Sequence, residues 1–512
     1  MKKRYTTLLA LAMAASLLLT ACGGSTSARN TDASETQTAG TSETGTTDGA
    51  NANTDTNANT DTDTDTNTDS GTVQVTGADA AADESGYEFS DRDLDPSYDE
   101  VTATVTLTDG ATAVSGTGVT VSGDDLTITA AGIYILTGTL TDGSITVAAG
   151  EEDKVQLVLS GVSVTNSDGP ALYVASGDKV FLTLADGTDN SLTDGSGYTA
   201  TDDGTELDGA VFSCSDLTVN GSGSLTVHGN NKHGVVSKDD LVITGGTITV
   251  TAQNVALSGK DCVKLANAAL TLTAGSDGIR SDNNEDADRG YVYIHSGTVT
   301  IVSGSDGIQA VTDLYVAGGT INVEASDDGL HSDGTVTVTG GTLTISCGDD
   351  GIHADALLTI DGGTLAITAA EGLEATVVTI NDGDITINAS DDGINAAQKS
   401  SAYTPLVEIN GGNITIVMGA GDTDGIDSNG NIVINGGTVT VSGSSSFDYV
   451  GTGAINGGTV IVNGQQVTTL SNQMMGGMMG GQPGGNMGQG GMGGQPGGNI
   501  GGGSPGGMGG RP

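Results

Sequence analysis

Several residue types are scarce in this 512-residue sequence, and their scarcity limits what the protein can be. It has no tryptophan, 11 tyrosines and 4 phenylalanines, so stacking platforms for sugar rings are few. Its 15 lysines and arginines stand against 64 aspartates and glutamates, which gives a formal net charge of −49. This charge excludes a general nucleic-acid binder and favours cations or cation-bridged partners.

Proline is also nearly absent from the middle of the chain. Between Pro96 and Pro483 only Pro170 and Pro405 occur, and helical periodicity is almost missing there. Because proline cannot donate a hydrogen bond to a strand ladder, its near-exclusion is typical of a body of paired strands. The sequence therefore predicts an all-β region.

The first residues have the features of a bacterial secretion signal. Residues 2–4 are basic, residues 8–19 are apolar, and residues 19–22 (Leu-Thr-Ala-Cys) are similar to a lipobox. The apolar run is too short to span a membrane comfortably. We therefore expect residues 1–22 to form a lipoprotein signal, with lipid on Cys22 anchoring an extracellular protein to the cell membrane.

Two segments of biased composition flank the middle of the chain. Residues 23–96 are mostly Thr, Asp, Asn, Ser, Gly and Ala, and residues 471–512 are rich in Gly, Met, Gln and Pro. Neither segment has enough large apolar side chains to bury a core. We predict a disordered linker, a disordered tail, and a folded region over residues 97–470.

A period of about 22 residues runs through the second half of the chain. Each repeat places an acidic residue before a glycine, and the Asp-Gly glycines stand at positions 278, 307, 329, 351, 393 and 425. A Gly-Gly-Thr marker runs in register at residues 245–247, 318–320, 340–342, 362–364 and 436–438. A fixed short period of strands and glycine turns is typical of a solenoid.

Residues 340–360 illustrate one repeat. Leu343 and Ile345 alternate with threonines, as expected of a strand with one buried face, and two further short apolar stretches follow before the next Gly-Gly. Three strands in 21 to 22 residues favour a right-handed parallel β-helix over a left-handed one, which would repeat every 18. We predict an all-β solenoid of about 15 coils.

Stacked coils would place the aspartates in a column with a spacing of about 4.8 Å. Carboxylates about 5 Å apart repel by roughly 3 kcal/mol per pair at an effective dielectric near 20. They must take up protons, turn into water, or share a cation such as Ca²⁺, which binds six to eight oxygens. The alternative is that they are solvated turn residues, favoured before glycine for backbone reasons.

The spacing from Gly278 to Gly307 is 29 residues, so an acidic loop of about residues 282–288 must leave the coil beside the column. It is not an EF-hand, because Ala287 and Tyr293 stand where glycine and glutamate belong. The predicted calcium ligands from the column and the loop are Asp261, Asp277, Asp282, Glu285, Asp286, Asp306, Asp328 and Asp350.

The spacing from Gly393 to Gly425 is also long and places residues 398–405 outside the coil. Lys399 and Tyr403 are a rare cation and a rare aromatic in this region. We predict weak ligand contacts from both, an acidic group on Lys399 and a sugar ring on Tyr403. The alternative is an ordinary solvated loop.

Residues 259–263 (Gly-Lys-Asp-Cys-Val) and the acidic loop followed by residues 290–294 (Gly-Tyr-Val-Tyr-Ile) carry a family resemblance. From about residue 95 to 465 the chain resembles the carbohydrate-binding domain proteins of clostridial-type bacteria, secreted β-helices akin to pectate lyases. The resemblance implies a right-handed β-helix, bound calcium, and binding of plant cell-wall polysaccharide such as polygalacturonate or cellulose.

Three functions remain open. Binding of acidic or neutral polysaccharide without catalysis, by a monomer, is favoured because basic residues are few. A calcium-dependent pectate lyase would need a base for the C5 proton, and Lys260 and Arg280 are the best-placed candidates. The third possibility is a structural adhesin or stalk. His331 and His353 hold one position in successive coils, so we expect their rings to stack.

Overall fold

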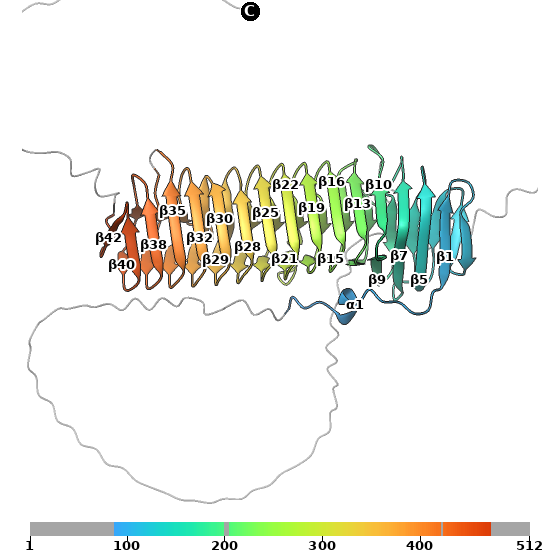
Figure 1. The fold of residues 1–512 in the computed structure, drawn as a ribbon, viewed down its shortest axis with the longest axis horizontal. Helices are drawn as coiled ribbons and strands as arrows, with labels where there is room; N and C mark the ends of the chain where they lie inside the picture. The colour runs from blue at the N-terminus through green and yellow to red at the C-terminus, as the bar shows by residue number, and fades with distance from the viewer. Residues whose placement is uncertain (1–85, 199–203, 421–422, 473–512) are drawn as a thin grey trace, which may run out of the picture.

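The computed structural model describes residues 86–198, 204–420 and 423–472. These residues form an elongated rod built almost wholly of short strands (Figure 1), with about 14 turns. The predicted all-β parallel solenoid is confirmed. The predicted signal with Cys22, most of the predicted linker and most of the predicted tail lie outside the described residues. Among the residues that are described, no helix is long and apolar enough to cross a membrane.

Three parallel sheets run along the rod, and each regular turn adds one strand to each sheet. Sheet A contains β10 (Asp189–Thr193), β13 (Ser224–Gly229), β16 (Thr247–Ala252), β19 (Ala269–Ala274), β22 (Thr298–Ser303), β25 (Thr320–Ala325), β28 (Thr342–Ser346), β30 (Thr364–Ala369), β32 (Asp384–Ala389), β35 (Asn413–Met418), β38 (Thr438–Ser442) and β41 (Thr459–Val462).

Sheet B contains the shortest strands: β4 (Asp125–Ile128), β6 (Ile145–Ala148), β8 (Leu172–Ser176), β11 (Gly209–Ser213), β14 (His233–Ser237), β17 (Leu257–Gly259), β20 (Ile279–Ser281), β23 (Ile308–Ala310), β26 (Leu330–Ser332), β33 (Ile394–Ala396), β36 (Ile426–Ser428) and β39 (Phe447–Tyr449). Sheet C contains β9 (Lys179–Leu184), β12 (Asp216–Gly221), β15 (Asp240–Ile243), β18 (Cys262–Leu265), β21 (Tyr291–Ile294), β24 (Asp313–Val316), β27 (Thr335–Val338), β34 (Leu406–Ile409), β37 (Asn431–Ile434) and β40 (Gly453–Ile455).

Two long strands, β29 (Asp350–Ile360) and β31 (Glu371–Ile380), pass from sheet B into sheet C without a break. Near the start of the rod, β5 (Gly132–Leu140) and β7 (Lys154–Thr165) pair in parallel through a register shift. Antiparallel pairs close the ends: β2 (Ala113–Gly116) on β1 (Ala103–Thr108), β3 (Val119–Ser122) on β4, and β42 (Gln465–Val467) on β41. These pairs cover ladder edges that would otherwise be open to other chains.

One continuous apolar core fills the rod. In β28, Leu343 and Ile345 are buried, and the three polar residues that alternate with them are exposed. The strand register places Leu343 between Ile321 and Leu365 of the neighbouring turns. Burying one such side chain contributes about 1.5–3 kcal/mol. Repetition of the same column in turn after turn stabilises the stack.

The two glycine markers stand at different corners for different physical reasons. At the corner from sheet C to sheet A, Gly341 has φ +94°, a conformation that favours glycine. Gly351, at the corner from sheet A to sheet B, has no such φ. A Cβ there would lie 2.3 Å from Cγ2 of Ile367 and 2.5 Å from the carbonyl oxygen of Gly372. Close stacking of adjacent turns therefore explains the glycine of the Asp-Gly pairs.

Residues 86–96, here called the N-terminal strap, lie along the outer face of sheet C, although their composition placed them in the linker (Figure 1). The strap contains the short helix α1 (Asp91–Leu94), capped by Ser90 and Asp93. It runs against the order of the turns. Tyr87 lies on β21 and β24, whereas the carbonyl of Pro96 accepts a hydrogen bond from Gln156 of β7.

The strap is held by buried polar contacts and by aromatic packing. Asp93 is 2% exposed, accepts a 2.6 Å hydrogen bond from Thr218, and forms a 2.9 Å ion pair with Lys179. The ring of Tyr87 stacks on Tyr293 with centroids 5.2 Å apart. The large side chains of the strap supply the buried surface that the rest of residues 23–96 lack.

Candidate functional site

A row of acidic side chains lines the corner between sheets A and B, each directly before a corner glycine. This carboxylate row consists of Asp277, Asp306, Asp328, Asp350, Glu371, Asp392 and Asp424. Four of the predicted ligands, Asp277, Asp306, Asp328 and Asp350, are therefore brought together, and all four are at most 7% exposed.

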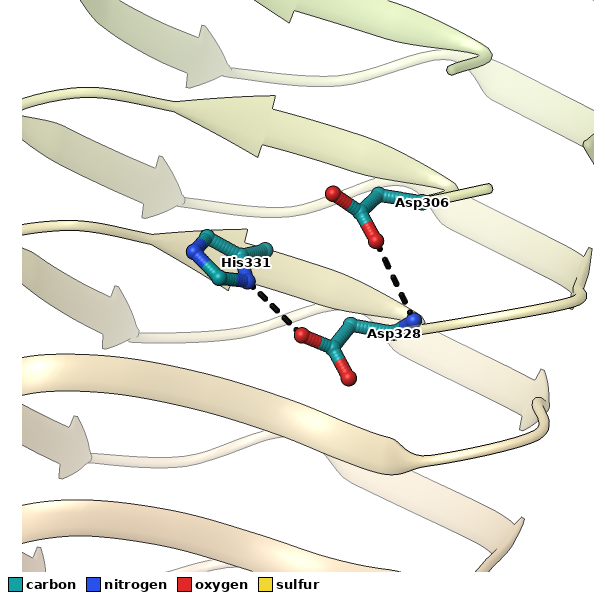
Figure 2. A group of neighbouring side chains, drawn as sticks. All are labelled: Asp306, Asp328 and His331. Carbon is teal, nitrogen blue, oxygen red and sulfur yellow. Dashed lines mark hydrogen bonds and ion pairs between the residues drawn. The ribbon is translucent and has the colours of Figure 1, made fainter. Parts of the chain in front are cut away.

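Backbone hydrogen bonds link the row along the rod. The N–H of Asp328 donates to Oδ1 of Asp306 at 3.2 Å (Figure 2), and the N–H of Asp350 donates to Oδ1 of Asp328 at 2.9 Å. The N–H of Asp424 donates to Oδ1 of Asp392 at 3.1 Å. One oxygen of each of these three carboxylates therefore accepts from the next turn, and the other can face a different partner.

A second row runs beside the first, formed by residues that share one register position in sheet B from β20 to β39. This sheet-B row consists of Arg280, Gln309, His331, His353, Glu374, Asn395, Asp427 and Asp448. The predicted stacking of His331 and His353 is confirmed, with ring centroids 4.7 Å apart and an interplanar angle of 8°. The rest of this row was not predicted from the sequence, although every member except Asp448 stands two residues after a corner glycine.

The sheet-B row supplies positive charge to part of the carboxylate row. Arg280 lies 3.3 Å from Asp277. His331 contacts Asp328 at 2.7 Å through Nδ1, as Figure 2 shows, and His353 contacts Asp350 at 2.7 Å in the same way. Three carboxylates and three basic side chains thus form repeated pairs, with the two members of each pair three residues apart in sequence.

Beyond His353 the balance of charge changes. Nδ1 of His353 also lies 3.0 Å from Glu374, and the Lys399 ammonium lies 2.8 Å from the same glutamate. Burial alone would lower the pKa of His353, but its contacts with Asp350 and Glu374 outweigh burial and raise it. The Lys399 loop therefore folds back onto the sheet-B row. Lys399, predicted as a weak ligand contact, is an ion-pair partner of Glu374.

Several carboxylates of the two rows have raised pKa values. Burial raises the pKa of Asp306 to about 6 and that of Asp427 to about 6. Burial, together with the charge of Asp427, raises the pKa of Asp392 to about 7. Desolvation and like charge both disfavour the ionised carboxylate, which is the environment that a bound cation relieves.

Several groups along the two rows could hold a metal ion. The carboxylates of Asp327, Asp328 and Asp349 offer ligand oxygens within 4.8 Å of one another, and Asp327 and Asp349 are exposed. This oxygen-only set suits Ca²⁺. Asp350, Glu371 and Glu374 form a second oxygen-only group on the rows, but two of its carboxylates already contact His353. Two other groups include a histidine, as in Asp306, Asp328 and His331, and nitrogen donors suit transition metals better.

The acidic loop lies at the other end of β20, so it does not extend the carboxylate row directly. Arg280 bridges the two, because its guanidinium also lies 3.4 Å from Asp282. Arg289 contacts Asp261 and lies 3.5 Å from Asp286. Arginines therefore already balance part of the charge of Asp261, Asp282 and Asp286, and calcium binding there, with Glu285, stays a prediction.

The two candidate lyase bases, Lys260 and Arg280, and the predicted sugar contact Tyr403 lie on different segments of the chain. Lys260 is half-buried, on the turn before β18, and Arg280 is engaged by two aspartates. Tyr403 is 38% exposed, on the loop that carries Lys399. Of these three residues, Arg280 contacts the carboxylate row, at Asp277.

The fold and the two rows define a class: a parallel β-helix with an acidic ladder along one corner. Residues 122–375 and 370–474 match the family described as carbohydrate-binding domain-containing protein. These matches cover more than half of the chain, and the protein belongs to this family.

A relative in Acetivibrio thermocellus, also described as a carbohydrate-binding domain-containing protein, is 42% identical over 136 residues. The match covers 26% of this chain and 48% of the relative, about half of the relative's length. A solved structure, the polysaccharide lyase-like protein from C. thermocellum in a gadolinium derivative, is 34% identical with a TM-score of 0.46. That alignment covers 46% of this chain and 97% of the solved one.

Proposed function

We propose that this protein binds acidic plant cell-wall polysaccharide, such as polygalacturonate, with Ca²⁺ as the bridge and without cleaving it. The observation that carries the proposal is the oxygen-only group of Asp327, Asp328 and Asp349 on the carboxylate row. Two of its three side chains are exposed, so a cation held there would still face a ligand from solution.

The charge of the molecule supports a bridging cation. A chain of −49 cannot attract a polyanion by direct contact on average, and it has no tryptophan for stacking. Ca²⁺ accepts more oxygens than these three side chains supply, so uronate carboxylates could complete its shell. Neutral glucans such as cellulose lack that charge, and we expect them to bind more weakly.

The surroundings of the row favour binding over catalysis. A lyase needs a base near the cation, and Arg280 is held by Asp277 and Asp282. Lipid anchoring through Cys22 at the cell surface belongs to the same proposal. It would present the rod to polysaccharide outside the cell.

The test is a pull-down of the purified protein on insoluble polygalacturonate in excess Ca²⁺ and in excess chelator, with absorbance of the unsaturated product followed over time. We expect retention in Ca²⁺, loss in chelator, and no rise in absorbance. Equal retention in both conditions would refute the bridging role. A rising absorbance would instead identify a lyase, and loss of that product in Lys260→Ala or Arg280→Ala with retained binding would locate its base.

A further inference from the structure

Charge compensation along the two rows stops near the C-terminal end of the rod. Lys399 is the only lysine, arginine or histidine between His353 and Arg511 in the sequence. It is already engaged by Glu374 at 2.8 Å. Within the described ranges, no basic side chain forms an ion pair with Asp392, Asp427 or Asp448.

These aspartates stand close together in the stack. Asp392 precedes β33 on the carboxylate row, and Asp427 and Asp448 are register partners on β36 and β39. The charge of Asp427 acts on Asp392, and that of Asp448 acts on Asp427. An acidic group in this position needs an external positive charge if it is to stay ionised.

An unpaired amide oxygen points to the same place. Asn395 is 8% exposed, and its Nδ2 donates to Glu371 at 2.9 Å and to Glu374 at 3.3 Å. Its Oδ1 is buried and accepts no hydrogen bond within the described part of the chain. The amide nitrogen is engaged by two glutamates of the preceding turn, and in the following turn the register partner of Asn395 is Asp427.

A buried carbonyl oxygen without a donor is costly, by about 1–3 kcal/mol. A cation would satisfy the Asn395 oxygen and balance the neighbouring carboxylates at once. The amide side chain and the carboxylates are hard oxygen donors, the ligands that Ca²⁺ takes in proteins. The histidines of the sheet-B row lie in earlier turns and are already engaged by Asp328 and Asp350.

We propose that Asp392, Asn395 and Asp427 hold a second Ca²⁺ ion, distinct from the one proposed on Asp327, Asp328 and Asp349. This site is largely buried, so it would stabilise the last turns of the rod rather than bind sugar. The inference is independent of the proposed polysaccharide binding, because the cation would bind in its absence.

The first test is equilibrium dialysis of the full chain against Ca²⁺, without polysaccharide. We compare the wild type with Asp427→Asn, which keeps the shape of the side chain and removes one charge. The matched control is Asp384→Asn, because Asp384 is exposed on β32 in the turn that also contains Asp392. We expect Asp427→Asn to bind one Ca²⁺ fewer per chain and the control to bind as many as the wild type. Equal numbers in all three proteins would overturn the site.

A second readout covers the case in which Asp427→Asn alters folding. In chelator, the variant should melt at or above the wild-type temperature, because like-charge repulsion is relieved. In saturating Ca²⁺ the order should reverse, because only the wild type gains the stabilisation of this bound ion. An unchanged difference between the two proteins in chelator and in Ca²⁺ would contradict a cation at this site. Loss of polygalacturonate binding is not expected from this variant, so its outcome is separate from that of the proposed function.

Discussion

At the scale of the residue, the position two places after each corner glycine determines how a buried carboxylate is balanced. Asp277 has Arg280 at 3.3 Å, and Asp350 has His353 at 2.7 Å. Asp392 has Asn395 at that position instead, which carries no charge. The carboxylate of the same Asp-Gly corner therefore has an arginine, a histidine or an uncharged amide beside it. Where the neighbour is the amide, the charge of the carboxylate is not balanced by that side chain.

A buried carboxylate in the strap allows a test by pH. Burial alone would raise the pKa of Asp93, but hydrogen bonds from Thr218, Lys179 and Ser90 outweigh it and lower the pKa below 3.8. Because the folded-state pKa is lowered, Asp93 contributes stability above the unfolded pKa, and this contribution is lost as pH falls through the folded pKa.

We predict that Asp93→Asn costs about 2 kcal/mol at pH 7, the scale of a hydrogen bond to a charged group. The difference from the wild type should shrink below pH 4. Chemical denaturation of both proteins at neutral and acidic pH measures it. A difference that stays constant down to pH 2 would show that the ionised carboxylate is not what holds the strap.

At the scale of the element, the strap makes aromatic contacts with sheet C. The Tyr87 ring lies 5.2 Å from Tyr293 and 5.5 Å from Tyr315, both of which are 3% exposed. We predict that Tyr87→Ala lowers the free energy of unfolding by about 1–3 kcal/mol, because it uncovers these rings and removes aromatic pairs. The change in the denaturation midpoint is the measurement.

The control for this variant is Tyr98→Ala. Tyr98 follows the strap and is 39% exposed, so its removal should change the midpoint little. A wild-type midpoint for Tyr87→Ala would mean that the strap does not stabilise the rod.

The elements of the rod could be predicted because their signals repeat. One period with Asp-Gly and Gly-Gly corners is enough to imply parallel stacking, the corner positions and the column of aspartates. The strap could not be predicted, because Tyr87, Phe89 and Leu94 are diluted by the polar residues before them. Its partners Lys179 and Thr218 lie some 90 to 125 residues away in sequence, and no local pattern reports such a contact.

The candidate site was predictable only in part for a related reason. The aspartate column follows from the period, and so does the stacking of His331 on His353. The return of Lys399 to Glu374 depends on the path of an irregular loop, which periodicity does not describe. The burial of Asn395 likewise depends on three-dimensional packing. So does the pairing of its amide, in which the nitrogen is hydrogen-bonded and the oxygen has no donor among the described residues.

At the scale of the whole molecule, the repeated turns that make the rod also repeat its negatively charged side chains. Seven successive turns each add one acidic side chain at the same corner, from Asp277 to Asp424, so the negative charge of this corner grows with the number of turns. The strap begins on β21 and β24, so residue 86 enters the described structure part-way along the rod rather than at its first turn (Figure 1). The carboxylate row lies at a different corner, between sheets A and B, and the strap covers sheet C.

The central claim is that a cation on the exposed carboxylates links this acidic rod to an acidic polysaccharide. The most direct measurement is calorimetric titration of soluble polygalacturonate oligomers into the wild type and into a double variant, Asp327→Asn with Asp349→Asn. Asp186→Asn, an exposed aspartate after β9, is the matched control for loss of charge. With Ca²⁺ present, we predict binding by the wild type and the control, and at least tenfold weaker binding by the double variant, about 1.4 kcal/mol. Chelator should abolish binding in all three. Binding by the double variant as tight as that of the wild type in Ca²⁺, or wild-type binding that survives chelator, would contradict the account.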